Sequence, residues 1–190
     1  MESTTAERAL ELLKQGNARF VSGHTDGRGR DVSRTRELVT VQHPYAVVLC
    51  CSDSRVVPEL LFDTGLGDLF VIRVAGNVVN ESTIASLELA VTFVDARLIV
   101  VMGHQNCAAV EAALNGLQAG PHVERLFSHI RPAIEITDDR RVDTVARHNC
   151  TINADRLVAE SQIIRDAMET NGLRIATAFY HFETGRVEFD

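Results

Sequence analysis

Apolar positions along the chain follow two patterns, one of helical period and one of short continuous runs. Over residues 5–20 they recur at nearly helical spacing between charged residues, which predicts an amphipathic helix. Three later runs are short, rich in β-branched residues and bounded by turn residues, as buried strands are: 45–51, 69–75 and 98–102. Helices are predicted at 82–93, 107–117 and 154–168, a fourth strand at 173–180, and a hairpin turn at 183–186 before a short strand at 187–189.

This alternation predicts an α/β fold with a mainly parallel central sheet flanked by helices. The chain has 190 residues, 45% of them hydrophobic, which is enough to bury one core. We therefore expect a single α/β domain over residues 1–190. Within it, residues 1–31 are expected to form an N-terminal helical arm and a linker, the linker being the Gly-rich, charged stretch 23–31.

Charge and apolar content narrow the range of partners. The chain has 19 Lys and Arg against 26 Asp and Glu, and the net charge of -7 would repel phosphate backbones, so no nucleic-acid partner is expected. No apolar run approaches the ~20 residues that span a bilayer, and no basic-then-apolar leader begins the chain. We expect no membrane association and a cytoplasmic location. The four cysteines are too few and too irregular for a disulfide framework, which favours metal binding or catalysis.

Two clusters of reactive side chains follow predicted strands. Cys51-Ser-Asp53-Ser-Arg55 ends the first strand, and Gly-His104-Gln-Asn-Cys107 ends the third. Neighbouring parallel strands lie only ~5 Å apart and their carboxyl ends share one edge, so both clusters are expected to face one cleft. Zinc favours thiolate and imidazole ligands, and His104 and Cys107, three apart in the opening turn of a helix, are expected to hold one Zn2+ together with Cys51. Three protein ligands leave a fourth position for water, as in catalytic zinc sites.

Asp53 and Arg55 are the candidates for controlling that water. A carboxylate can accept a proton from zinc-bound water while a guanidinium group holds it in place and keeps it ionised. If Arg55 released Asp53, the carboxylate could become a fourth zinc ligand in a closed state. A strand-end salt bridge without function is the commoner use of such a pair. The position two residues from a metal thiolate favours function.

Other candidate side chains are interpreted as structural. Cys50 points to the opposite face of its strand and is expected in the core. His148 and Cys150 have no partner cluster in the sequence. The remaining histidines stand alone and are expected at the surface or at caps, although one could relay protons from the cleft: His24, His43, His122, His129 and His181. No CxxC is present, which disfavours a thioredoxin-like role.

The segments around the two clusters resemble the β-class carbonic anhydrase family: CSDSRVVPELLFDTGLGDLFVIRVAGN (51–77), ASLELAV (85–91) and LIVVMGHQNC (98–107). The resemblance extends from residues 14–20 to residues 183–187. It implies one Zn2+ per subunit on Cys51, His104 and Cys107, with Asp53 and Arg55 as a catalytic dyad. It implies hydration of CO2 to bicarbonate by attack of zinc-bound hydroxide. It also implies a homodimer or homotetramer whose N-terminal helices embrace the partner and whose sites lie at the subunit interface.

The resemblance further implies a substrate pocket. Gln42 matches a glutamine that hydrogen-bonds substrate, and Phe70 matches an apolar wall residue. Three positions depart from the family pattern and make the pocket more apolar or narrower: Val74 replaces Asn, Leu89 replaces Tyr, and Ala108 replaces Gly. Some relatives with this zinc site hydrolyse carbonyl sulfide or carbon disulfide, so such a hydrolase is an alternative. A non-catalytic bicarbonate-binding protein is a third hypothesis, which the presence of both dyad residues disfavours.

Overall fold

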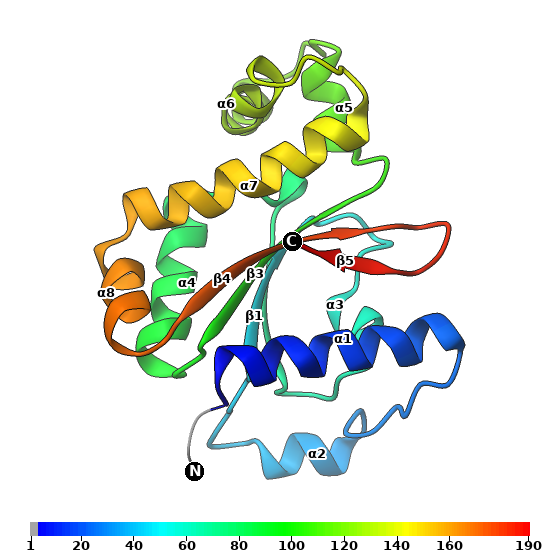
Figure 1. The fold of residues 1–190 in the computed structure, drawn as a ribbon, viewed down its shortest axis with the longest axis vertical. Coiled ribbons are helices and arrows are strands. Elements are labelled where there is room, and N and C mark those ends of the chain that lie inside the picture. The colour runs from blue at the N-terminus through cyan, green and yellow to red at the C-terminus, as the bar shows by residue number, and fades with distance from the viewer. Residues whose placement is uncertain (1–3) are drawn as a thin grey trace.

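The computed structural model describes residues 4–190 and is built around one five-stranded sheet (Figure 1). The strand order is β2 (Leu69–Arg73), β1 (Ala46–Cys50), β3 (Leu98–His104), β4 (Arg174–Tyr180) and β5 (Val187–Phe189). The first four strands are parallel, and β5 returns antiparallel to β4 through the hairpin predicted at 183–186. The predicted α/β fold with a mainly parallel sheet is confirmed.

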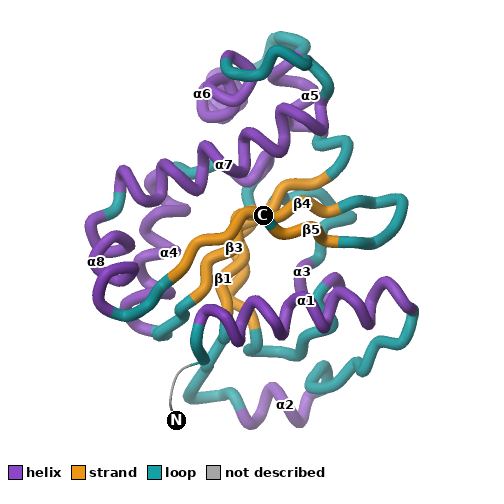
Figure 2. Tube along the Cα trace, viewed as in Figure 1, coloured by secondary structure: helices purple, strands orange, loops and turns teal. Residues whose placement is uncertain are grey.

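Helices cover both faces of the sheet (Figure 2). On one face, α1 (Ala6–Ser22) buries Ala6, Ala9 and Leu13 against Val48 and Cys50. The other face carries α4 (Glu81–Phe93), α7 (Val142–Glu160) and α8 (Gln162–Thr170). Every second residue of β1 and β3 packs on this face: Val47, Leu49, Ile99 and Val101. Because successive strand side chains point to opposite faces, strands buried on both sides appear in the sequence as continuous apolar runs.

The N-terminal helix is docked on its own chain. Gly16 lies so close to Phe62 that a Cβ there would meet the Phe62 carbonyl oxygen, so the two backbones nearly touch. The buried Asn17 side chain donates to the carbonyl oxygens of Leu61 (3.1 Å) and Gly185 (3.0 Å) and accepts from the Val187 amide (2.8 Å). Thus α1 connects the segment after β1 to the β4–β5 hairpin.

Several helices were not predicted from the pattern. α2 (Val32–Glu37) buries no residue, so it leaves no periodic signal. α3 (Pro58–Leu61) and the 3-10 turn η1 (Ala75–Asn77) are single turns. α6 (Pro121–Glu135) contains Pro132, a residue that usually ends helices, and accommodates it in the last turn. The predicted helix at 107–117 is shorter, as α5 (Ala108–Leu114).

The prediction of one helix over 154–168 is wrong. α7 begins twelve residues earlier, at Val142, and ends at Glu160. Ser161, which has an extended backbone conformation, separates it from α8. The Ser161 hydroxyl accepts from the Ile164 amide (3.1 Å) to start α8 and donates to the Glu88 carboxylate (2.6 Å). A serine that serves as a cap favours a helix boundary over a continuous helix. Within residues 4–190, none of the helices is both long enough and apolar enough to cross a bilayer.

Candidate metal centre

Three potential metal ligands meet at the carboxyl edge of the sheet. Cys51 directly follows β1, His104 ends the adjacent strand β3, and Cys107 precedes α5. Their ligand atoms all lie within 4.8 Å of one another, and the two Sγ atoms are 4.0 Å apart. All three residues are buried, with His104 at 0% exposure. The structure brings the three sequence-predicted ligands together.

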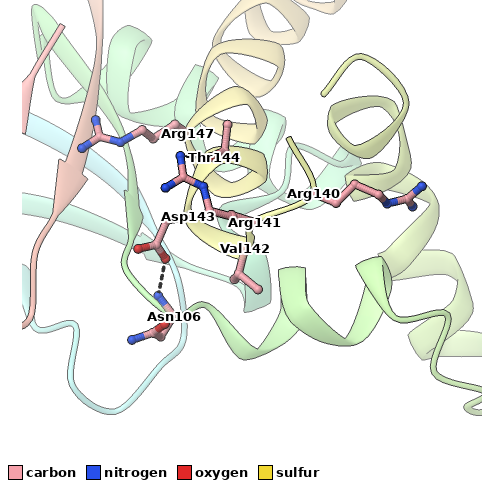
Figure 3. A pocket seen from close by; sticks show the side chains of 7 residues that line it. All are labelled: Asn106, Arg140, Arg141, Val142, Asp143, Thr144 and Arg147. Atoms are coloured by element: carbon pink, nitrogen blue, oxygen red, sulfur yellow. Dashed lines mark hydrogen bonds between the residues drawn. The ribbon is translucent and has the colours of Figure 1, made fainter. Parts of the chain in front are cut away.

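The connection between His104 and Cys107 differs from the prediction. The two residues do not share the opening turn of a helix, because His104 belongs to β3 and the chain turns back at Asn106, where φ is +51°. Asparagine tolerates this left-handed conformation better than most residues. The Asn106 amide donates to the Asp143 carboxylate (2.7 Å) at the start of α7, at the wall of a cavity of about 580 Å3 (Figure 3). α7 therefore holds the loop that presents both ligands.

The protonation of the three side chains suits a cation. The His104 Nδ1 lies 2.9 Å from the Gln105 carbonyl oxygen, which only accepts, so Nδ1 carries the proton and Nε2 presents a lone pair. Among residues 4–190, nothing hydrogen-bonds this buried Nε2. Hydrogen bonds from the Cys107 thiol and from the Gly76 amide (3.3 Å) lower the pKa of Cys51 to about 4.

The hydrogen bond that the Cys107 thiol donates to Cys51 raises the pKa of Cys107, and burial and repulsion from the neighbouring thiolate raise it further. Cys51 and Cys107 would hold a divalent cation that offsets this repulsion, and the free Nε2 of His104 would serve as a third ligand. Two sulfur atoms and one imidazole nitrogen are the donors that zinc prefers. The residues present therefore fit a zinc ion.

Asp53 and Arg55 form a planar, two-armed ion pair beside the cluster. Arg55 Nε donates to Asp53 Oδ1 (2.9 Å), Nη2 donates to Oδ2 (2.8 Å), and the Arg55 amide donates to Oδ1 (2.9 Å). These hydrogen bonds lower the pKa of the Asp53 carboxyl to about 2. Each carboxylate oxygen can accept about two hydrogen bonds, so within the described chain Oδ1 is saturated and Oδ2 keeps one acceptor position.

Supporting residues that the sequence analysis missed fix the backbone of this region. Arg73, at the end of β2, donates to the carbonyl oxygens of Cys51 (3.2 Å) and Asp53 (2.6 Å). Asn149 is fully buried on α7, and its side chain donates to the carbonyl oxygen of Gly76 (2.8 Å). Gly76 has a φ of +67°, and its backbone amide donates to the Cys51 sulfur. The one available signal was the polar pair Asn149 and Asn153, four residues apart on an otherwise apolar helix face.

The predicted pocket residues fall into two groups. Ala108 is exposed directly after Cys107, and Val74 packs in the apolar cluster that contains Cys51 and Cys107. The others, Gln42, Phe70 and Leu89, do not join the metal centre within this chain.

Gln42 precedes β1 and therefore lies at the opposite end of that strand from Cys51, and residues 46–51 alone span roughly 17 Å. Phe70 is paired with Val47, near the same far end. Leu89 and Gln42 line a separate cavity of about 660 Å3. One end of the sheet thus carries the ligands and the other carries most of the predicted pocket.

The cysteines interpreted as structural are buried away from the ligand group. Cys50 packs on the α1 face of the sheet and is fully buried, as predicted. The Cys150 thiol donates to the Ala146 carbonyl oxygen (3.2 Å) inside α7, and His148 Nδ1 lies 2.6 Å from the Thr137 hydroxyl. Among the described residues, Cys51, His104 and Cys107 form the sole group of three such side chains with metal-binding spacing.

Comparisons with known proteins agree with this geometry. The model of the carbonic anhydrase family matches residues 46–187. The carbonic anhydrase of Mycolicibacterium smegmatis is 36% identical over 195 residues, covering 99% of this chain and 95% of the relative. Carbonic anhydrase 2 of Mycobacterium tuberculosis is 35% identical over 193 residues, covering 98% and 93%.

A solved structure supports the same assignment. The β-carbonic anhydrase CcaA superposes with a TM-score of 0.76 at 27% sequence identity, over 96% of this chain and 86% of that chain. The family match spans most of the sequence, including both clusters at the carboxyl edge of the sheet. The chain belongs to the β-carbonic anhydrase family.

Proposed function

We propose that this enzyme hydrates CO2 to bicarbonate at a zinc ion held by Cys51, His104 and Cys107. The observation that carries the proposal is the buried trio itself, with its unpartnered His104 Nε2 and the Asp53–Arg55 pair beside it. When bound, zinc supplies a Lewis acid that makes water a nucleophile near neutral pH. The three ligands leave one of the four positions that zinc favours for that water.

In this proposal Asp53 orients the nucleophilic water by accepting its hydrogen bond on Oδ2. Arg55 occupies the other acceptor positions of the carboxylate, so one direction remains for the water. A carboxyl group whose pKa is about 2 does not keep a proton at neutral pH. Asp53 therefore acts as an acceptor that aligns the attacking oxygen, and the released proton passes on to solvent or buffer.

We further propose that a second copy of the chain completes the substrate pocket. Gln42, Phe70 and Leu89 lie too far from Cys51 to contact the same substrate molecule within one chain. The surface around them is unusually apolar, with Phe93 81% exposed and Leu89 47% exposed. Burial of such a patch in a homodimer or homotetramer is favourable and would bring these side chains to the partner's zinc site.

Hydrolysis of carbonyl sulfide is the second candidate activity. Val74 packs in the same apolar cluster as Cys51 and Cys107, so the wall beside the ligands offers no hydrogen-bonding side chain at that position. A less polar substrate loses less by entering such a site. The same nucleophile and the same Asp53 acceptor would serve both substrates.

One set of measurements tests both activities. Zinc content, stopped-flow CO2 hydration and sulfide release from carbonyl sulfide would be measured on the purified protein, on Cys51→Ala and on Cys50→Ala. We expect one zinc per chain in the wild type and in Cys50→Ala, whose side chain faces the core, and loss of zinc and activity in Cys51→Ala. Faster turnover of carbonyl sulfide than of CO2 would favour the second activity. Zinc-loaded wild type that turns over neither substrate would refute both.

A further inference from the structure

Phe182, in the β4–β5 hairpin, contacts both halves of the site. The Arg55 guanidinium carbon lies 4.1 Å from the centroid of the Phe182 ring. On the ligand side, the His104 and Phe182 ring centroids are 5.2 Å apart. The side chain is partly buried. Phe182 carries no ionisable or metal-binding group, so no motif in the sequence marks it.

The backbone and ring of Phe182 are fixed from three directions. The backbone amide of Phe182 donates to the side-chain oxygen Oε1 of Gln105 (3.1 Å). The backbone amide of Gln105 donates to the Tyr180 carbonyl oxygen (2.9 Å). The rings of Tyr180 and Phe182 meet edge to face, 5.2 Å between centroids. At the far side of the hairpin, Asn17 of α1 binds Gly185 and Val187. Phe182 is thus anchored to the loop that carries the metal ligands.

Arg55 has no comparable anchor of its own. Its side chain is 54% exposed, and its guanidinium hydrogen bonds within the described chain go to Asp53. A long, exposed side chain samples many rotamers, and each departure from the planar arrangement would free Asp53. The face of an aromatic ring attracts a guanidinium group and holds it at a defined height and tilt.

We propose that Phe182 is a positioning residue that holds Arg55 in the plane of the Asp53 carboxylate through its aromatic face. The inference rests on the proposed function, because it assigns Phe182 a part in orienting the nucleophile through Asp53. An aliphatic side chain of similar volume would fill the space without fixing the guanidinium plane. Tyrosine would retain the aromatic face.

The first test compares three variants. Phe182→Leu removes the aromatic face, Phe182→Tyr keeps it, and Phe189→Leu is the matched control. Phe189 is a partly buried phenylalanine of the same hairpin that packs against Phe62, 6.0 Å between centroids. We expect kcat/KM for CO2 hydration to fall about fivefold in Phe182→Leu, the size of one cation–π contact. Phe182→Tyr should restore it, and Phe189→Leu should leave it unchanged with zinc content equal in all.

The second test changes the electrostatics of the ring while nearly keeping its shape. Phenylalanine analogues with one, two and three ring fluorines, placed at position 182, weaken the negative face stepwise. We expect log kcat/KM to fall stepwise with fluorination, which a role in packing alone would not produce. A flat series, with Phe182→Leu no worse than Phe189→Leu, would overturn the proposal. Loss of zinc in Phe182→Leu would also overturn it, because the ring would then act through His104.

A readout independent of turnover separates this inference from the proposed function. Hydrogen exchange of the Arg55 Nε–H, assigned by its disappearance in Arg55→Lys, reports whether the hydrogen bond to Asp53 Oδ1 is kept. We expect faster exchange in Phe182→Leu and wild-type exchange in Phe189→Leu. If the wild type fails to hydrate CO2 but exchange responds in this way, the positioning role stands and the proposed function fails. Unchanged exchange in Phe182→Leu refutes the positioning role whatever the activity.

Discussion

Asp63 and Asp53 both bind arginine, and the protein uses the two carboxylates in opposite ways. Asp63 is a completely buried carboxylate that accepts from Arg19 Nε (2.7 Å), Arg30 Nη2 (2.9 Å) and the amides of Asp26 (2.8 Å) and Gly27 (3.2 Å). Asp53 is 13% exposed and receives its three hydrogen bonds from Arg55 alone. A carboxylate has about four acceptor positions. Asp63 accepts four hydrogen bonds, and Asp53 accepts three.

The difference in donor count separates a structural ion pair from a functional one. Asp63 has no acceptor position left, and its donors come from α1 and from the linker, so it fastens the N-terminal segment to the body. Asp53 keeps one position on Oδ2, beside the metal centre, where a water molecule can bind. A pattern of Asp near Arg does not distinguish these uses. An unfilled acceptor position that lies beside the metal ligands does.

Removal of the Asp63 carboxylate should have the largest effect. Asp63→Ala leaves Arg19 and Arg30 without their buried partner and two amides without an acceptor. Breaking a buried pair in this way lowers the free energy of unfolding by about 3–5 kcal/mol. Urea denaturation measures the loss. Zinc content and turnover per folded molecule should stay at the wild-type level, and a selective loss of turnover would place Asp63 in the site after all.

Asp53→Asn should lower turnover and leave stability nearly unchanged, the reverse of the result expected for Asp63→Ala. The amide can turn an N–H toward the position where Oδ2 accepts, so the nucleophilic water loses its orienting acceptor. We expect kcat/KM for CO2 hydration to fall by about a hundredfold, or about 2.7 kcal/mol of transition-state stabilisation. The free energy of unfolding should change little, since a partly exposed pair contributes about 0–1 kcal/mol. Full activity in a zinc-loaded Asp53→Asn would remove Asp53 from the mechanism.

The contrast also explains which features were predictable from the sequence. Asp53 and Arg55 are two residues apart and follow a strand, so local spacing was enough to pair them. The ligands on β1 and β3 were predictable because parallel strands bring their carboxyl ends together. Asp63 and its arginines are separated by 33 and 44 residues and meet only through the packing of α1 and the linker. No local pattern encodes such a contact.

Some helices and some residues around the site also lacked a local sequence pattern that could reveal them. α2 and α6 were missed because one buries nothing and the other contains a proline, so each violates the pattern used to find helices. Phe182 and Gln105 act through ring geometry and an amide hydrogen bond that tertiary folding creates. Gln42, Phe70 and Leu89 were assigned to the pocket by resemblance, and one chain alone does not bring them to the ligands.

The pH dependence of stability gives a smaller effect that sharpens the comparison. Burial alone would raise the pKa of Asp63, but hydrogen bonds from Arg19 and from two amides outweigh it and lower the pKa. A carboxyl group with a lowered pKa in the folded state stabilises the protein above the unfolded-state pKa, about 3.9 for Asp. That stabilisation is lost as pH falls through the lower, folded-state pKa.

Urea unfolding of the wild type and of Asp63→Asn between pH 7 and pH 3 isolates this contribution. The difference in unfolding free energy between the two proteins should be constant near neutral pH and shrink below about pH 4. Its size should remain below the loss in Asp63→Ala, because asparagine keeps part of the hydrogen bonding. A difference that grows on acidification would show that burial, and not the arginine and amide donors, controls the Asp63 carboxyl.

The smallest effect is expected at an ion pair that resembles the Asp63 pair in distance and differs in exposure. Glu7 Oε1 and Arg174 Nη2 lie 2.7 Å apart and connect α1 to β4, yet their side chains are 63% and 68% exposed. Water replaces such a contact at little loss, because neither charge was removed from solvent on folding. Glu7→Gln should leave the urea midpoint and the CO2 hydration rate within experimental error of the wild type. A loss as large as that of Asp63→Ala would mean that the attachment of α1, and not burial of a saturated carboxylate, determines the stability of this region.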